Sequence, residues 1–154
     1  GAALGSADYR DEYSNKLVED WTKQLSVLCE IAMTQPQAAY TAYVRGFNSK
    51  LTYFLRTIPE FGKYLHPIQR LLENKFIPAL LGTESVSPHV LEIVSLPVRH
   101  GGLGIPNVVK ESAQQFAGST KITSIHKQAI VDQLGDMPKT DRHDELTAPA
   151  MCCP

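Results

Sequence analysis

The sequence predicts an all-α fold. Apolar residues recur every three or four positions through most of the chain, which is the period of a helix that buries one face. Prolines and glycines separate these periodic segments, where they would begin and end helices. The alternation of apolar and polar residues that marks a half-buried strand is absent from the sequence. We therefore expect packed helices, with any strand kept short.

The first helix is predicted over residues 8–33. Ser6 or Asp8 can cap its start, and the acidic residues of its first turn suit the positive end of the helix dipole. The apolar positions of this helix are Tyr9, Tyr13, Leu17, Trp21, Leu25, Leu28 and Ala32. Their spacing of three or four residues predicts one continuous buried stripe.

The second helix should begin near Pro36, because proline is favoured in the first turn of a helix, with Thr34 as the N-cap. Pro59 would help to end it, because proline has no N–H group to continue the hydrogen-bond ladder. The apolar positions of this helix are Tyr40, Val44, Phe47, Leu51, Phe54, Leu55 and Ile58.

The third helix should begin around Pro67 and end at Gly82, which can supply the C-terminal cap. Pro78 falls inside the periodic pattern and should kink or shorten the helix. The apolar positions of this helix are Ile68, Leu71, Leu72, Phe76 and Leu80. Together the three predicted helices would form one bundle.

Shorter elements follow the bundle. A polar linker over residues 83–87 precedes a short helix that ends near Val94. Asn107 starts a last helical stretch to about Leu134, with a break expected near Gly118. From residue 135 onward the apolar periodicity is lost, which predicts a linker or a disordered tail.

The segment SLPVRHGGLGIPN, residues 95–107, raises the question of a phosphate-binding loop. It lacks the lysine–hydroxyl pair of a P-loop and the third glycine of a dinucleotide-binding turn. Gly101 and Gly102 permit positive φ, so we expect a tight turn that acts as a structural clasp. Its apolar residues, which would press against the helices, are Leu96, Val98, Leu103 and Ile105.

The composition is ordinary for a soluble globular protein, with 43% hydrophobic and 20% charged residues among 154. The net charge of −1 predicts no global attraction to nucleic acid or to a membrane, and no apolar run approaches the 18 residues of a membrane span. The adjacent Cys152 and Cys153 lack CxxC spacing, and His89, His100 and His126 lack metal-ligand spacing. We therefore predict no metal site.

The charges are nevertheless segregated along the chain. Residues 8–30 carry three basic and six acidic side chains, a net charge of −3. Residues 35–75 carry six basic and two acidic side chains, a net charge of +4, and the chain from Val131 onward returns to −3. A local basic region can attract a polyanion even when the total charge is near zero.

The second helix carries a polar stripe within this basic region. Its members fall at i, i+4, i+7 and i+11, opposite the apolar face, and are Arg45, Ser49, Thr52 and Arg56. Arginine and hydroxyl groups at this spacing suit contacts with phosphate and sugar. Lys50 and Lys63 are weaker candidates for the same role. The alternative interpretation is an ordinary solvated helix face.

Several segments together resemble one family. They occur in the order GAALGS, TQPQAAYTAYVRGFNSKLTYFLRTIP, FIPALLG and LPVRHGGLGIPN. This order resembles the region just after the palm of retrotransposon-type reverse transcriptases, especially those of non-LTR-like elements. The resemblance covers roughly residues 1–134. It implies that residues 1–7 end the palm hairpin, that residues 8–82 form a thumb-like helical bundle, and that residues 83–134, which contain the glycine-rich clasp, form a helical connection. Residues 135–154 remain the predicted linker or disordered tail.

In this family the palm carries a Phe/Tyr-x-Asp-Asp motif whose aspartates hold two metal ions, which implies Mg²⁺ for the parent polymerase. The chain contains no such motif. We therefore interpret it as a non-catalytic fragment, with no catalytic residues, metal ligands or cofactor of its own. The resemblance implies two partners, an RNA–DNA template–primer duplex and the upstream palm and fingers of the same polyprotein, and no membrane.

Two other functions remain open. A helical protein-interaction module without nucleic-acid binding would dock its partner through a strip of small residues and a partly exposed aromatic face. The strip is Ala38, Ala42 and Gly46, and the face is Tyr40, Tyr43, Phe47 and Tyr53. A hydrolase would have to combine Ser95 and His100 of the glycine segment with an acid, but no recognisable motif pairs a nucleophile with a base.

Overall fold

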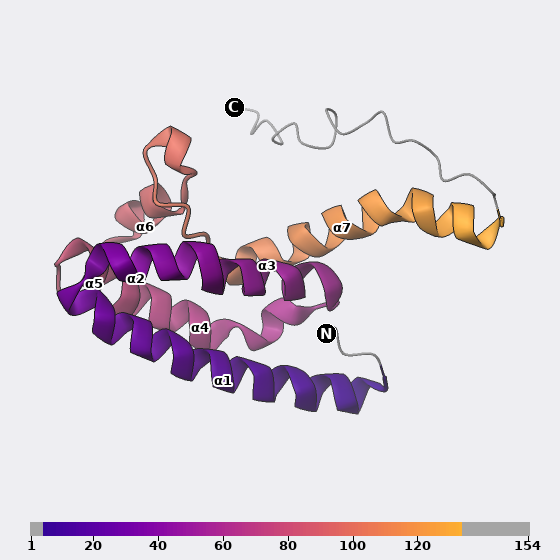
Figure 1. The fold of residues 1–154 in the computed structure, drawn as a ribbon, viewed down its shortest axis with the longest axis horizontal. Coiled ribbons are helices and arrows are strands. Elements are labelled where there is room, and N and C mark those ends of the chain that lie inside the picture. Colours follow the sequence, from indigo (N-terminus) through magenta and orange to yellow (C-terminus); the bar gives the residue numbers. More distant parts are fainter. Residues whose placement is uncertain (1–4, 134–154) are drawn as a thin grey trace.

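The computed structural model describes residues 5–133, and every regular element within this range is helical (Figure 1). The predicted all-α fold is thereby confirmed. The predicted tail of residues 135–154 lies outside the described residues, as do residues 1–4 of the predicted palm hairpin.

Helix α1 (Ala7–Thr34) begins where the sequence predicts it, because the Ser6 hydroxyl accepts a hydrogen bond from the Tyr9 N–H at 3.3 Å. The spacing of its buried residues is that of a regular α-helix, and these residues are Ser14, Val18, Trp21, Leu25, Cys29 and Ala32. Of the predicted apolar stripe, Trp21, Leu25 and Ala32 are buried, and three further members pack against the core while only partly buried, namely Tyr13, Leu17 and Leu28. Tyr9, at its start, is exposed instead.

Helix α2 (Pro36–Ala42), the π-helical turn η1 (Tyr43–Phe47) and α3 (Asn48–Thr57) form one continuous helix. Its buried residues recur at every fourth position and are Ala39, Tyr43, Phe47, Leu51 and Leu55. Four residues of an α-helix turn through about 400°, so such a stripe would drift by about 40° at each step. The π turn takes up one extra residue and thereby brings the stripe back toward the core.

Two expectations for this helix are wrong. Thr34 does not cap it, because the Thr34 hydroxyl donates to the Ile31 carbonyl at 3.3 Å, at the end of α1. The N-cap is Gln35, which makes no side-chain capping bond. Tyr40 and Val44 are only partly buried, because the buried stripe begins one residue earlier than the sequence predicts.

Helix α4 (His66–Leu71), the π-helical turn η3 (Leu72–Phe76) and α5 (Ile77–Leu81) form a second continuous helix. The expected shortening at Pro78 does not occur. The π turn widens the helix just before Pro78, which relieves the clash between a proline ring and the carbonyl one turn earlier. Gly82 is the predicted cap, with a left-handed φ of 67°.

These two long helices and α1 pack as a three-helix bundle, and aromatic residues fill its interior. Trp21 of α1 lies edge-on to three rings of the partner segments, with centroid distances of 6.2 Å to Phe47, 5.1 Å to Phe54 and 6.0 Å to Phe61. Each π turn contributes a ring to the same core, since the Tyr43 and Phe76 centroids lie 5.0 Å apart. The core therefore ties all three helices together.

Helix α6 (Pro88–Ser95) and the loop after it, which contains the short 3₁₀ turn η4 (Val98–His100), close over the bundle. The loop folds back on the end of α6, where the Leu103 N–H donates to the Val94 carbonyl at 3.1 Å. The Tyr40 hydroxyl of α2 donates to the Leu103 carbonyl at 2.8 Å. These bonds hold the glycine segment against α2 and α6, as a clasp would.

The glycines of this loop differ in what they do. Gly101 has a left-handed φ of 83°, as expected, but Gly102 does not have a positive φ. Gly102 is required instead for a close approach, because a Cβ atom there would lie 2.0 Å from the Leu96 carbonyl oxygen. The expectation that Leu96 and Val98 press against the helices is also wrong, since both side chains are exposed.

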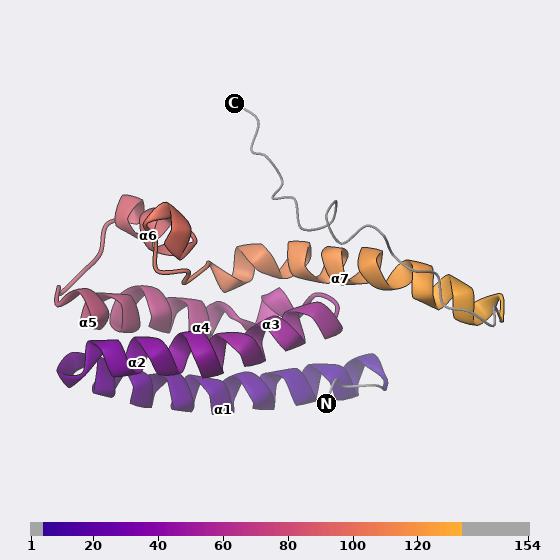
Figure 2. The same cartoon turned by 45° about the horizontal axis from the view of Figure 1, so that its top comes forward.

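Helix α7 (Val108–Val131) begins at Asn107, whose side-chain oxygen accepts a hydrogen bond from the Lys110 N–H at 3.0 Å. It lies against α3 on the side of the bundle opposite α1, and its C-terminal half runs beyond the other helices in both views (Figures 1 and 2). The expected break near Gly118 is absent, because one glycine costs a helix only about 1 kcal/mol, too little to end it.

A turn that the sequence did not predict connects α3 to α4. Glu60 adopts a left-handed φ of 55°, and the 3₁₀ turn η2 (Phe61–Tyr64) follows. Gly62 in this turn allows α7 to approach, because a Cβ atom there would lie 2.1 Å from the Ser112 Oγ atom. No helix within residues 5–133 is both long enough and apolar enough to cross a membrane.

Candidate nucleic-acid interface

The polar stripe predicted on the second helix lies at a groove between α3 and α7. The groove has a volume of about 500 Å³. Its lining residues are Asn48, Ser49, Thr52, Tyr53, Arg56 and Thr57 of α3 and Ser119 of α7. Three of the four predicted stripe residues therefore share one concave surface.

The chemistry of this lining suits an anion. It consists of hydroxyl, amide, phenol and guanidinium groups, and none of the lining residues is a carboxylate. An anionic ligand would meet one fixed positive charge, that of Arg56, and no opposing negative charge from the walls. Arg45 is exposed one turn before Ser49, outside the lining, where it extends the positive surface along the helix.

Arg56 is held in place by α7. Its Nε atom donates a hydrogen bond to the Gln115 Oε1 atom at 3.0 Å. A guanidinium group has five N–H donors, so this bond orients the side chain and leaves donors for a ligand. Ser119, one turn after Gln115 on α7, lines the groove opposite α3.

The groove hydroxyls already make local hydrogen bonds. The Ser49 hydroxyl donates to the Arg45 carbonyl at 3.3 Å, and the Thr52 hydroxyl donates to the Asn48 carbonyl at 2.9 Å. Bonds of this kind to the preceding turn are weak and common in helices. A hydroxyl rotates about its C–O bond, so each can exchange this acceptor for a phosphate oxygen.

Lys50 and Lys63 lie elsewhere. Lys50 is one residue beyond Ser49, which places it about 100° further around the helix. Its Nζ atom donates to the Gln24 Oε1 atom of α1 at 3.3 Å. Lys63 lies in η2, where its Nζ atom is 3.4 Å from Asp11 Oδ1. Neither lysine lines the groove.

The aromatic face of the alternative interaction module is not present as expected. Tyr43 and Phe47 are buried in the core, and Tyr40 is only partly exposed, with its hydroxyl bound to the glycine loop. Tyr53 alone of the four is exposed, at 47%, and it lines the groove. Exposed aromatic rings can stack on nucleic-acid bases, so Tyr53 would also suit a nucleic-acid ligand in the groove.

Sequence reasoning missed the contribution of α7. Gln115 and Ser119 carry a weak signal, since they are polar residues spaced by four on one helix face. That signal does not say which helix the face meets. Only the packing of α7 on α3 brings these residues to the predicted stripe.

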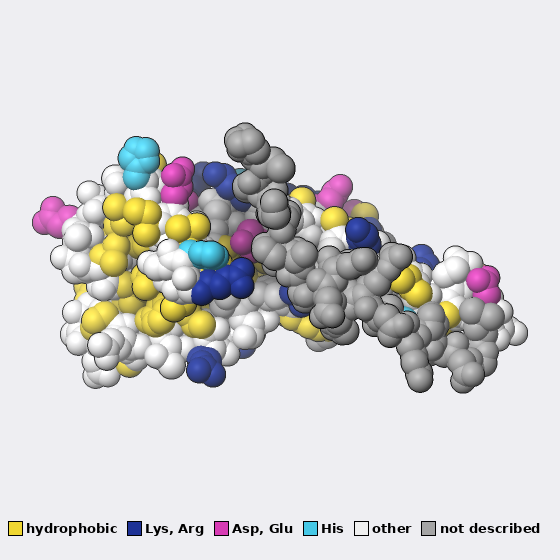
Figure 3. Space-filling model, turned by 90° about the horizontal axis from the view of Figure 1, so that it is seen from above, with side chains coloured by type: hydrophobic (Ala, Val, Ile, Leu, Met, Phe, Trp, Pro, Cys, Tyr) yellow, Lys and Arg dark blue, Asp and Glu magenta, His cyan; other side chains and the backbone are white. Residues whose placement is uncertain are grey.

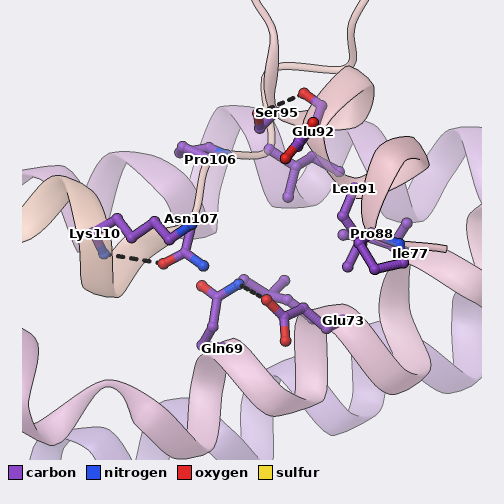
Figure 4. Close-up of a pocket in the computed structure, with 12 residues that line it drawn as sticks. Gln69, Glu73, Ile77, Pro88, Leu91, Glu92, Ser95, Pro106, Asn107 and Lys110 are labelled. Atoms are coloured by element: carbon purple, nitrogen blue, oxygen red, sulfur yellow. Dashed lines mark hydrogen bonds between the residues drawn. The ribbon is translucent and has the colours of Figure 1, made fainter. Parts of the chain in front are cut away.

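A second cavity lies beneath the glycine loop, with a volume of about 280 Å³ (Figure 4). Its polar residues make structural bonds. The Gln69 side chain donates to Glu73 Oε1 at 2.7 Å and accepts from the Val108 N–H at 2.9 Å, which links α4 to the start of α7. The Ser95 hydroxyl donates to the Glu92 carbonyl at 2.7 Å.

The cavity does not assemble the catalytic triad considered for a hydrolase. The Ser95 hydroxyl is bound to a backbone carbonyl, and the His100 Nε2 atom accepts from Arg99 Nε at 3.2 Å. No bond joins Ser95 to His100 in the described chain. Within residues 5–133, no group of three or more His, Cys, Asp or Glu side chains is arranged to hold a metal ion.

Comparisons of the chain with protein families, with curated proteins and with solved structures gave no significant match.

Proposed function

We propose that the chain is a non-catalytic part of an RNA-directed DNA polymerase of a non-LTR-type retrotransposon, and that it grips the template–primer duplex. The observation that carries the proposal is the groove between α3 and α7, which combines a fixed arginine with hydroxyl groups and has no carboxylate in its lining. The resemblance to the region after the palm of reverse transcriptases supports the same function.

The dimensions of the stripe suit a nucleic-acid backbone. Arg45 and Arg56 are 11 positions apart, which corresponds to about 16 Å along a helix. This distance spans several successive phosphates of one strand of a duplex. Two guanidinium groups at the ends and two hydroxyls between them would contact phosphates without reading the bases. Binding would therefore be independent of sequence.

The catalytic part of this proposal belongs to the rest of the polymerase. The aspartate pair of the palm and its Mg²⁺ ions would perform nucleotidyl transfer, with the fingers and palm adjoining the bundle. The groove would fix the position of the duplex and would take no part in the chemistry. No residue of this chain is assigned a catalytic role.

The test is binding of a fluorescently labelled RNA–DNA duplex, followed by anisotropy over a series of salt concentrations. Affinity should fall steeply with salt, because phosphate contacts release counterions. Arg56→Ala should weaken binding about tenfold, the loss expected for one hydrogen-bonded charge, and should lower the salt slope by about 1. Arg45→Ala should act in the same direction, and neither variant should change sequence preference.

Lys50→Ala is the matched control. It removes one positive charge from the same helix at a position that faces α1 and does not line the groove. Equal losses of duplex affinity for Lys50→Ala and Arg56→Ala would show that the duplex is attracted to the basic region in general and not to the groove. Affinity that does not depend on salt would contradict the proposal.

The helical interaction module remains the second candidate, because one surface favours it. Hydrophobic side chains gather over α6 and the start of the glycine loop (Figure 3). Ile93, Leu96 and Val98 there are 54%, 42% and 68% exposed. Exposed apolar patches often mark protein-binding surfaces. Ile93→Ser would abolish such an interaction and leave duplex binding unchanged.

A further inference from the structure

A separate cleft lies at the end of the bundle where α1 begins. It has a volume of about 310 Å³ and opens between the first turns of α1 and the turn that follows α3. Arg10, Asp11 and Ser14 of α1 line one side. Glu60 belongs to the turn, and Lys63 and Tyr64 of η2 line the other side. This volume is at the lower end of the range for ligand pockets, about 300–1,000 Å³, so it suits a small group.

Two polar groups in the cleft have no partner within the described chain. Ser14 is fully buried, and its Oγ atom makes no hydrogen bond. The Nε atom of Arg10 is also buried and has no acceptor. The two residues are separated by four positions on α1, so their side chains lie on the same face. Buried donors without partners are uncommon in proteins, and they point to a missing acceptor.

The nearest carboxylate does not serve as that acceptor. Asp11 accepts hydrogen bonds from the Tyr64 hydroxyl and from Lys63, whose Nζ atom lies at 3.4 Å. The hydrogen bond from Tyr64 and the Lys63 ammonium lower the pKa of Asp11, so its charge is matched within η2 and α1. Glu60 is exposed at the side of the cleft. The Arg10 charge also helps to lower the pKa of Asp11, but the buried Arg10 Nε–H group has no acceptor among the described residues.

We propose that this cleft binds an oxyanion of the phosphate class, held by the Arg10 guanidinium and the Ser14 hydroxyl. A guanidinium group offers several N–H donors to one phosphate, and a hydroxyl can donate to a further oxygen. Two sources share this chemistry, free phosphate and a backbone phosphate of a nucleic acid. The second source rests on the function proposed above, and Thr57 at the groove is directly followed by Ile58 of the cleft wall.

The primary test is calorimetric titration of the 154-residue chain with inorganic phosphate, at an ionic strength held constant with chloride. Saturable binding is expected, with a shift of the Arg10 Nε–Hε resonance in NMR spectra. Arg10→Gln should raise the Kd about tenfold, the loss expected for a hydrogen bond to a charged group. Ser14→Ala should also raise the Kd, and it should fold normally because it removes only a hydroxyl that has no partner.

Arg70→Gln is the matched control, since it removes the same charge from an exposed position on α4 that does not line the cleft. No saturable binding by the wild-type chain would overturn the proposal, as would equal Kd values for Arg10→Gln and Arg70→Gln. In that case water alone would satisfy the two donors.

A second measurement identifies the source of the phosphate. If Arg10→Gln weakens both phosphate and RNA–DNA duplex binding, the cleft takes a backbone phosphate. If it weakens only phosphate binding, the cleft takes free phosphate. A wild-type chain that binds phosphate and no duplex would refute the proposed function and leave the oxyanion site in place.

Discussion

Replacing Gly102 by alanine should open the loop that covers the end of α6. The added Cβ atom would lie 2.0 Å from the Leu96 carbonyl oxygen and 2.6 Å from that of Ile93. Both obstructing atoms belong to the backbone, so no side chain can rotate away to relieve the clash. The loop must therefore move away from α6.

That movement would break three hydrogen bonds from loop N–H groups to carbonyls of α6 and the residue that follows it. The acceptor of the Leu103 and Ile105 N–H groups is Val94, at 3.1 and 3.3 Å, and Gly104 donates to Leu96 at 2.9 Å. At about 1 kcal/mol for each bond, the free energy of unfolding should fall by about 3 kcal/mol. With a urea m-value of about 2 kcal/mol per molar, the midpoint should fall by about 1.5 M.

The assay is urea unfolding followed by circular dichroism, with Gly118→Ala as the matched control. Gly118 lies inside α7, and an added Cβ atom there would meet nothing within 4 Å. Alanine should therefore stabilise the helix by about 0.5–1 kcal/mol. If Gly102→Ala unfolds at the wild-type midpoint or above it, the close approach of the loop to α6 is refuted.

Three further predictions concern the core and the surface. Trp21→Ala should lower the free energy of unfolding by about 3–5 kcal/mol in the same assay, because Trp21 is 4% exposed among aromatic rings; a loss below 1 kcal/mol would contradict this packing. Tyr40→Phe should cost about 1 kcal/mol by removing the bond to the glycine loop, and the loss should disappear if that bond does not form in solution. Tyr64 and Lys63 lower the pKa of Asp11 in the folded chain. Their contribution to stability is therefore present above the ordinary pKa of an aspartate and is lost as the pH falls through the lowered pKa of Asp11. Asp11→Asn should flatten this acid dependence, and an unchanged pH profile of unfolding would contradict the pairing.

Three helix ends could be predicted from the sequence because their causes are local. Ser6 and Asn107 each cap a helix by accepting a hydrogen bond from the backbone N–H group three residues later. Gly82 supplies the left-handed conformation at the end of α5. These features depend on neighbours in the chain, so a single sequence contains the information. Within residues 5–133, the predicted and observed long helices agree for this reason.

The register of the second helix could not be predicted in the same way. An α-helical period places Tyr40 and Val44 in the core, but the π turn at Tyr43–Phe47 shifts the buried face to Ala39 and Tyr43. The π turn forms because packing against the third helix stabilises it, and the third helix is distant in sequence. Propensity alone does not contain this information.

The candidate groove was predicted only in part. The stripe of Ser49, Thr52 and Arg56 follows from helical spacing on one segment, and the structure places all three along one surface. Gln115 and Ser119 come from a helix more than 50 residues away in sequence. An amphipathic pattern identifies a face that will be buried, but it does not identify the helix that will bury it.

The π turn also determines where the chain can change in length. An i→i+5 turn holds one residue more than an α-helical turn, so a single deletion within Tyr43–Phe47 would leave a regular α-helix with both flanking halves facing their original neighbours. A deletion at Lys50, within the regular part of α3, would rotate every later residue by about 100° and carry Arg56 away from Gln115. A deletion of one codon should therefore be tolerated in the first segment and should disrupt the groove in the second.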